Sequence, residues 1–259
     1  MPDMAQEITV CGEAWELVYT YRECDKLTFA DAGAARVYRG RCVETGDAVA
    51  IKVARKDGGQ IFNDRTTWDK LARSGGWNGL PKLLARCYNF GDGSEEALVC
   101  ELCGPSLGWC IRQRENNKLS VSEVSTVGVE VLRHLQRLHG QGFAHRDISP
   151  GNLLLPRQPA ADDSPLLYLI DFGLAEKLNI NSHSKQDRSG TLRFASSQIG
   201  IGPLSAYDDL EGDWQTRPAP TCTVFPTHLG SLYDCVLQCS QTLTCTCSGR
   251  ARVRLASRV

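Results

Sequence analysis

The sequence has no long apolar run and almost no net charge, and both absences exclude classes of protein. A helix that crosses a membrane needs about 20 consecutive apolar residues, and no such stretch occurs among the 259 residues. The formal net charge is -1, whereas nucleic-acid-binding proteins usually carry a basic excess. The start includes Asp3 and Glu7 and lacks the basic segment that opens a secretory signal. We therefore expect a cytoplasmic or nuclear protein that contacts neither membrane nor nucleic acid.

Cysteine, by contrast, is frequent, at 12 residues, and falls into two groups. The residues from Cys11 to Cys110 mostly lie inside apolar runs, so we expect reduced, buried thiols there. Two interpretations of the other group remain open: a zinc site, which prefers tightly paired thiolates, or a segment from an altered reading frame, which we favour. This second group has no Cys-x-x-Cys spacing and consists of Cys222, Cys235, Cys239, Cys245 and Cys247.

Apolar patterning predicts short strands in the first half and a helix-led second half. One helix is expected at Asn63–Arg73, and the clearest helix begins at the capping box Ser120-Val-Ser-Glu123 and ends at Gly140. This order of elements predicts an α+β fold with two lobes. The expected strands are Lys26–Ala30, Arg36–Cys42, Ala48–Ala54, Leu98–Leu102, Leu153–Leu155 and Leu166–Ile170.

Two motifs carry chemistry: His145-Arg-Asp-Ile-Ser-Pro-Gly-Asn152 and, directly after an apolar strand, Asp171-Phe-Gly173. Phosphoryl transfer needs one carboxylate that orients the attacking hydroxyl, together with an amide and a second carboxylate that hold Mg²⁺. Asp147 suits the first role, and Asn152 and Asp171 suit the second. The alternative is a pair of unrelated aspartates in surface turns, but the order and spacing of the motifs argue against it.

These motifs resemble those of the eukaryotic protein kinase superfamily, and three further segments resemble its casein kinase I branch. The segments are Leu98–Leu107, Gly190–Ser196 and Asp208–Glu211. The resemblance implies a bilobal kinase fold with a β-rich N-lobe and a helical C-lobe. It also implies transfer of the γ-phosphoryl of ATP to Ser or Thr hydroxyls of a protein substrate, with ATP and Mg²⁺ as cofactors.

The same resemblance implies which residues bind the nucleotide. Lys52, in Val49-Ala-Ile-Lys52, would neutralise the α- and β-phosphates. Its best-placed acidic partner is Asp64, one methylene shorter than the family's glutamate, so we expect a strained or water-bridged ion pair. Backbone groups of Glu101 to Cys103 would bind the adenine edge, in front of Cys100. The expected nucleotide-binding set is Lys52, Ala30, Ala32, Gly33, Ala35, Val37, Ala50, Glu101 and Cys103.

Departures from the family pattern leave three functions open. Ala30, Ala32 and Ala35 stand where the family has phosphate-loop glycines, which stiffens the loop and weakens the expected ATP affinity. Ser149 replaces a lysine that would steady the γ-phosphate. We favour an active serine/threonine kinase. The alternatives are a kinase-like binding or regulatory module with little turnover and, last, a small-molecule phosphotransferase.

The resemblance ends at about Glu211, and the expected domain boundaries follow from it. We expect an N-terminal extension at 1–25, a kinase domain at 26–211 and a divergent Cys- and Thr-rich tail at 212–259. The N-lobe would span about 26–102, and an incomplete C-lobe about 103–211. Because core helices of that lobe would lack their partners, we expect low stability for the isolated chain.

Overall fold

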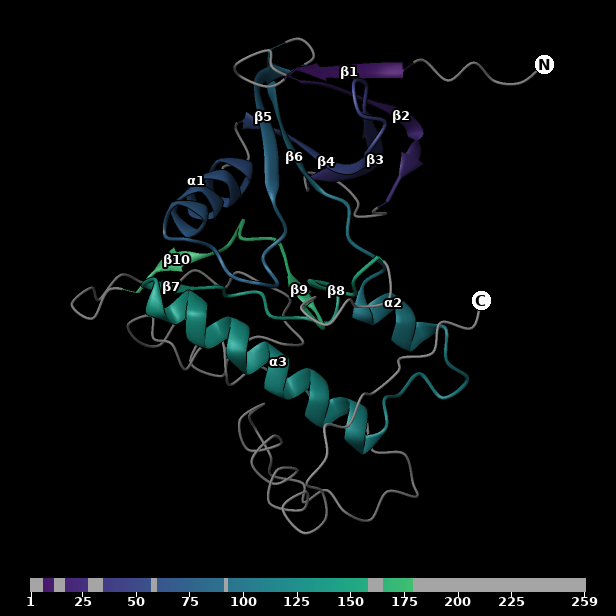
Figure 1. Cartoon of the computed structure of the whole chain (residues 1–259), viewed down its shortest axis with the longest axis vertical. Coiled ribbons are helices and arrows are strands. Elements are labelled where there is room, and N and C mark those ends of the chain that lie inside the picture. Colours follow the sequence, from purple (N-terminus) through teal and green to yellow (C-terminus); the bar gives the residue numbers. More distant parts are fainter. Residues whose placement is uncertain are drawn as a thin grey trace. The chain divides into compact units, whose positions relative to one another are not determined.

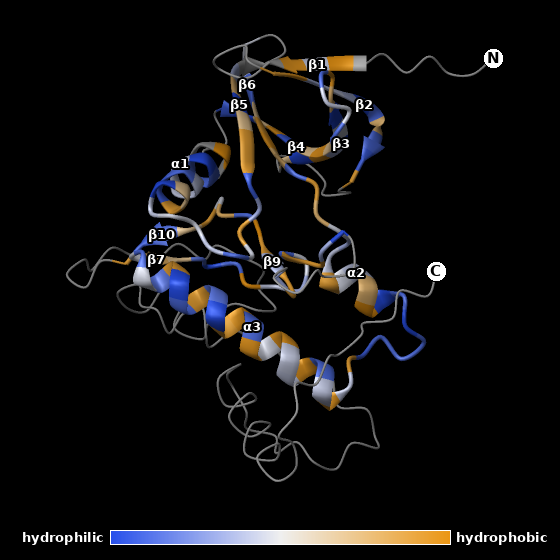
Figure 2. Cartoon of the chain, viewed as in Figure 1, coloured by the Kyte–Doolittle hydropathy of each residue, from blue (hydrophilic) through white to orange (hydrophobic). Residues whose placement is uncertain are grey.

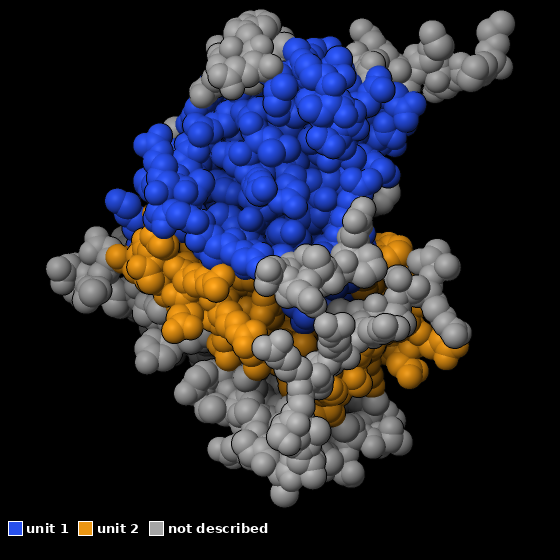
Figure 3. Space-filling model, in the orientation of Figure 1, with its two compact units in different colours: residues 1–107, 150–177 blue, residues 108–149, 178–259 orange. Residues whose placement is uncertain are grey.

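The computed structural model describes residues 7–11, 17–27, 35–56, 60–90, 93–157 and 165–178. The chain divides into two compact units, coloured separately in Figure 3. The first comprises residues 1–107 and 150–177, and the second comprises residues 108–149 and 178–259. The expected segments at Gly190–Ser196 and Asp208–Glu211, and the cysteines from Cys222 to Cys247, lie outside the described residues.

The first unit contains a six-stranded antiparallel sheet in the order β1-β2-β3-β4-β6-β5 (Figure 1). The sheet is mainly a meander, because each of the first three strands pairs with the next along the chain. The exception is β6, which lies between β4 and β5. The strands are β1 (Glu7–Cys11), β2 (Val18–Lys26), β3 (Arg36–Cys42), β4 (Ala48–Arg55), β5 (Leu83–Phe90) and β6 (Glu95–Glu101).

Alternation along β4 explains which face of the sheet is its core. Val49, Ile51 and Val53 are buried, while the residues between them are only partly so, as expected for a strand with period two. Tyr21 and Tyr38 stack in the same core with ring centroids 4.4 Å apart. A side chain on Gly40 would meet Ile51 and the Thr20 carbonyl oxygen at under 3 Å, so this close approach requires glycine. The opposite face is the one that carries Lys52.

One strand prediction needs correction, and two strands were missed. Of the strand expected at Lys26–Ala30, Lys26 is the last residue of β2 and pairs with Tyr38, Leu27 is not in a strand, and residues 28–30 lie outside the described residues. Two whole strands, β1 and β5, were not predicted. β5 mixes Arg86, Cys87 and Asn89 into its apolar positions, which hides the period-two pattern. The strands expected at Arg36–Cys42 and Ala48–Ala54 are confirmed as β3 and β4.

Helix α1 (Gln60–Arg73) and a small hairpin complete the described part of the first unit. The helix begins three residues earlier than expected. Its buried positions follow helical spacing: Ile61, Asp64, Thr67, Trp68 and Leu71. β8 (Leu153–Leu154) pairs with β9 (Tyr168–Leu169), and β10 spans Glu176–Lys177. An aspartate therefore lies on the buried stripe of α1.

The second unit is led by α3 (Val121–Gly140), with β7 (Phe143–Ala144) after it. The predicted capping box is confirmed: Ser120 accepts from the Glu123 amide, and the Glu123 side chain accepts from the Ser120 amide. Apolar positions recur along α3 between hydrophilic ones (Figure 2). Its buried residues are Ser125, Val127, Gly128, Val131, His134, Leu135 and Leu138. A short helix, α2 (Leu107–Arg112), crosses the boundary between the units. Across the described ranges, no helix is both long and apolar enough to span a bilayer.

Candidate active site

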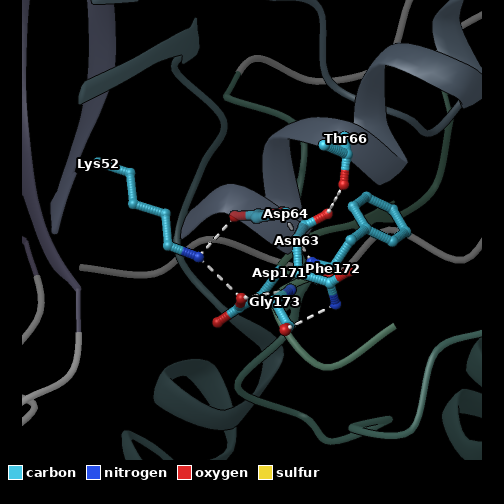
Figure 4. Close-up of polar contacts among 7 residues, drawn as sticks. All are labelled: Lys52, Asn63, Asp64, Thr66, Asp171, Phe172 and Gly173. Carbon is cyan, nitrogen blue, oxygen red and sulfur yellow. Dashed lines mark hydrogen bonds and ion pairs between the residues drawn. The ribbon is translucent and has the colours of Figure 1, made fainter. Parts of the chain in front are cut away.

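The centre of the candidate site is the ammonium group of Lys52. Its Nζ lies 2.6 Å from Oδ2 of Asp64 and 2.8 Å from Oδ1 of Asp171 (Figure 4). The Lys52 side chain is 14% exposed and Asp64 is 0% exposed, whereas Asp171 is 42% exposed. The pairing of Lys52 with Asp64 expected from the sequence is therefore present, and it is direct rather than bridged by water.

Burial and charge act in opposite directions on this cluster. Burial alone lowers the pKa of an ammonium group, but the carboxylates of Asp64 and Asp171 outweigh it and raise the pKa of Lys52 above its usual value. Burial also raises the pKa of Asp64, against the effect of Lys52. The first shift favours an ionised pair and the second opposes it. We assign the ionised pair, because Asp64 accepts two hydrogen bonds, at 2.6 and 2.9 Å.

Asp64 also links helix α1 to the segment that follows Asp171. Its Oδ1 accepts a hydrogen bond from the Phe172 amide at 2.9 Å. The Phe172 ring packs edge-on against Trp68, with centroids 5.8 Å apart at 66°. The Trp68 indole donates to the Pro81 carbonyl at 3.1 Å. Two residues one turn apart on α1 therefore fix both the backbone and the side chain of Phe172.

The β8–β9 hairpin explains how Asn152 and Asp171 approach each other. Leu153 pairs with Leu169, and the Ile170 amide donates to the Asn152 carbonyl at 3.1 Å. Asn152 therefore comes just before β8, and Asp171 just after β9, at the same end of the hairpin. Asp171 has φ +67°, a conformation that costs a non-glycine residue about 1–3 kcal/mol. Its Oδ1 accepts from the Gly173 amide at 3.3 Å as well as from Lys52.

The segment expected to contact adenine is fixed at both ends by main-chain hydrogen bonds. The Glu101 amide donates to the Lys82 carbonyl at 2.9 Å, and the Gly104 amide donates to the Leu155 carbonyl at 2.8 Å. A Cβ on Gly104 would lie 2.8 Å from the Pro156 carbonyl oxygen, so glycine is required. The two bonds hold the intervening Leu102 and Cys103 in a defined path beside β6.

The two cysteines near this segment are protonated at neutral pH. Burial raises the pKa of Cys103 to about 12, with Glu101 adding to the effect. Burial also raises the pKa of Cys100 well above its usual value. Both side chains are buried. Their environment therefore suits core packing, the role favoured from the sequence, rather than thiolate chemistry.

The remaining expected nucleotide-binding residues fall into two groups. Val37 lies directly opposite Lys52, and Ala50 lies directly opposite Cys100. Directly opposite residues project from the same face of a sheet, so these four share the face of Lys52. Ala35 immediately precedes β3. The phosphate-loop positions Ala30, Ala32 and Gly33 lie outside the described residues.

Asp147 belongs to the second unit, and the other three expected catalytic residues belong to the first. The Asp147 amide donates to Nδ1 of His145 at 3.3 Å, and His145 is fully buried. Since Nδ1 accepts, the proton of a neutral His145 ring resides on Nε2. Arg146, between them, has φ +69°. The buried histidine therefore anchors the loop that carries Asp147.

One polar residue of this region was missed in the sequence. Asn63 Nδ2 contacts three main-chain oxygens: 2.7 Å to Ala175, 2.9 Å to Gly173 and 3.4 Å to Phe172. A partial signal was available, because Asn63 directly precedes an aspartate that interrupts an apolar stripe. The carbonyl partners, however, lie more than 100 residues away along the chain.

Comparison with known proteins identifies the family. The family model described as "Protein kinase domain" matches residues 32–202. Casein kinase I homolog 1 of Schizosaccharomyces pombe is 31% identical over 186 residues, covering 68% of this chain and 40% of the relative. Casein kinase I homolog 1 of Saccharomyces cerevisiae is 32% identical over 189 residues, covering 68% of this chain and 33% of the relative. The chain thus spans less than half the length of these relatives.

A solved structure agrees at the level of fold. The structure of vaccinia related kinase 3 matches with a TM-score of 0.67 at 16% identity, covering 94% of this chain and 78% of that chain. This confirms the kinase-like fold predicted from the sequence. Because the family model covers more than half of the chain, the chain belongs to the protein kinase family, within which it resembles the casein kinase I branch.

Proposed function

We propose that this chain transfers the γ-phosphoryl group of ATP to Ser or Thr hydroxyls of a protein substrate. The single observation that supports this most is the cluster of Lys52, Asp64 and Asp171 within direct hydrogen-bond distance. Burying an ammonium group together with carboxylates costs desolvation free energy. Such a cluster therefore indicates a functional purpose. Here that purpose is to present one positive charge beside a metal-binding carboxylate, as phosphoryl transfer requires.

The donor atoms near Asp171 fit Mg²⁺. Magnesium prefers oxygen ligands, and it is usually held by one or two carboxylates together with substrate phosphates. Asn152 and Asp171 offer an amide and a carboxylate at the same end of the β8–β9 hairpin. Within the described ranges, no group of three or more acidic, histidine or cysteine side chains forms a metal cage. This suits a metal that is completed by nucleotide phosphates.

Each expected catalytic residue then has a distinct task. Lys52 neutralises the α- and β-phosphates, and Asp64 keeps the Lys52 ammonium in place. Asn152 and Asp171 would hold Mg²⁺, which when bound offsets the charge of the phosphates. Asp147 orients the substrate hydroxyl and accepts its proton. Backbone groups of Glu101 to Cys103 bind the edge of adenine, above a sheet face lined by Val37 and Ala50.

A binding or regulatory module with little turnover is the second candidate, and one observation favours it. Ser149 is 6% exposed and stands where a lysine would supply positive charge near the γ-phosphate. A buried hydroxyl cannot replace that charge, so the transition state loses one electrostatic contact. Nucleotide binding, which depends mainly on Lys52 and Mg²⁺, would persist.

The experiment that tests the proposal is transfer of radiolabelled phosphate from ATP to casein. The wild-type chain is compared with Asp147→Asn and Asp171→Asn, which remove charge without changing size. The proposal predicts incorporation by the wild type and a loss of at least about 100-fold in both variants. Equal incorporation by all three chains would overturn it. ATP binding by the wild type without any transfer would establish the binding module instead.

A further inference from the structure

Helix α1 contacts the segment after Asp171 through two consecutive residues of opposite hydrogen-bonding character (Figure 4). Asp64 accepts from the Phe172 amide at 2.9 Å. Asn63 donates from Nδ2 towards the carbonyls of Ala175 and Gly173, at 2.7 and 2.9 Å. A carboxamide has two N–H donors, so these two shorter contacts use both. The 3.4 Å approach to the Phe172 carbonyl is a weaker third contact.

The contacted segment is a tight turn with an unfavourable start. Asp171 adopts φ +67°, and its Oδ1 accepts from the Gly173 amide at 3.3 Å. The Ala175 amide donates to the Phe172 carbonyl at 3.0 Å. These local bonds use the amides of Gly173 and Ala175. Asn63 supplies donors to its carbonyls, which buried backbone requires.

We propose that Asn63 is a positioning residue that holds residues 172–175 in the turn that presents Asp171 to Lys52 and to Mg²⁺. The inference rests on the proposed function for its consequence, but the contact itself is independent of activity. Because Asn63 and Asp64 are adjacent on α1, a shift of this helix releases both the amide and the carbonyl side of the turn together.

Asn63→Asp is the sharpest probe of this role. Aspartate has the same size and shape, but an ionised carboxylate donates no hydrogen bond and would face carbonyl oxygens. Thr66→Val is the matched control. Thr66 is also on α1, and its hydroxyl donates to the Asn63 carbonyl at 3.1 Å. Valine removes that bond while keeping the shape of the side chain, and the Asn63 carboxamide stays in place.

The measurement is hydrogen–deuterium exchange of the full chain, followed by ATP titration at several Mg²⁺ concentrations. In Asn63→Asp, amides of Phe172, Gly173 and Ala175 should exchange about tenfold or more faster relative to those of β6. The Mg²⁺ concentration for half-maximal ATP binding should rise, and Thr66→Val should change neither. The proposal is overturned if exchange at 172–175 stays at the wild-type rate, or rises only in proportion to β6.

The exchange data, taken together with the phosphate-transfer assay of the wild type, separate this inference from the proposed function. Faster local exchange in Asn63→Asp, combined with no phosphate transfer by the wild-type chain, supports the positioning role and rejects the kinase activity. Unchanged exchange in a wild-type chain that does transfer phosphate rejects the positioning role alone.

Discussion

The cluster around Lys52 and the cluster that opens α3 both contain an ion pair between a basic side chain and a carboxylate, but the first pair is more deeply buried. In the first, Lys52 is bound by a carboxylate that is completely buried. In the second, Arg114 binds Glu123 at 2.6 Å, with side chains that are 35% and 15% exposed. Glu123 also belongs to a local capping box. If Glu123 is removed, water can solvate the Arg114 guanidinium that remains. If Asp64 is removed, the Lys52 ammonium that remains is mostly shielded from water.

Of the two clusters, the one around Lys52 depends on contacts between residues far apart in the sequence. The α3 cluster assembles from residues within ten positions of one another. The Lys52 cluster joins β4, α1 and the segment after β9, with Lys52 and Asp171 separated by 119 positions. It therefore forms only when β4, α1 and the segment after β9 come together.

Asp64→Ala should have the largest effect. It leaves the Lys52 ammonium buried with only the more exposed Asp171, and it removes the acceptor of the Phe172 amide. We expect the free energy of unfolding to fall by about 3–5 kcal/mol, the usual result of breaking one side of a buried pair. Chemical denaturation would measure it. The double variant Lys52→Met, Asp64→Leu removes both charges and should recover part of this loss; no recovery would contradict the ion-pair account.

Glu123→Gln should have a smaller effect that depends on pH. The side-chain hydrogen bond from Arg114 lowers the pKa of Glu123 to about 2 from its ordinary value of 4.5. The stability contributed by this folded-state preference is therefore present above about pH 4.5 and is lost as the pH falls towards 2. Above pH 5 the variant should be less stable by about 2 kcal/mol. Denaturation at several pH values should show the two proteins converging in acid, and a constant difference would reject the assignment.

Ser120→Ala should cost about 1 kcal/mol, as loss of an N-cap usually does. Its hydroxyl accepts from the Glu123 amide at 3.3 Å. Melting temperature and helix content by circular dichroism would report the effect. Ser122→Ala is the matched control. Ser122 lies two residues further along the first turn of α3, and its side chain is not part of the capping box. Equal shifts in both variants would show that the capping box does not stabilise α3.

Arg133→Ala should have the smallest effect, under about 0.5 kcal/mol. Arg133 is 66% exposed, and its contact with Glu130 is 3.2 Å long. Solvent screens such a pair, so its loss should fall within the error of a denaturation curve. A loss of more than about 1 kcal/mol would show that exposed pairs on α3 matter as much as capping.

The helix and strands that could be predicted from the sequence are those whose structure is decided by local residue pattern. The limits of α3 and its capping box depend on neighbouring residues, and β3 and β4 show plain alternation. β1 and β5 could not be recognised, because their stability comes from pairing with other strands rather than from their own pattern. Strand β2 begins at Val18, eight residues before Lys26, where a strand was expected to begin.

The candidate site shows the same division. The spacing of Asp147, Asn152 and Asp171 is a motif, and the charge of Asp64 interrupts an apolar stripe, so these could be named in advance. The role of Asn63 could not, because its partners are main-chain carbonyls and any residue sequence can supply those. The geometry of the turn depends on φ at Asp171, which no residue type specifies.

The central claim is that Lys52 and Asp171 form one site for a metal-bound triphosphate. Calorimetric titration of ATP with and without Mg²⁺, on the wild type and Asp171→Asn, tests it most directly. The account predicts that Mg²⁺ strengthens ATP binding to the wild type at least about tenfold, and that this gain disappears in Asp171→Asn while binding of ATP without metal remains. Binding that is equally strong with and without Mg²⁺ in the wild type, or a full metal effect in the variant, would contradict it.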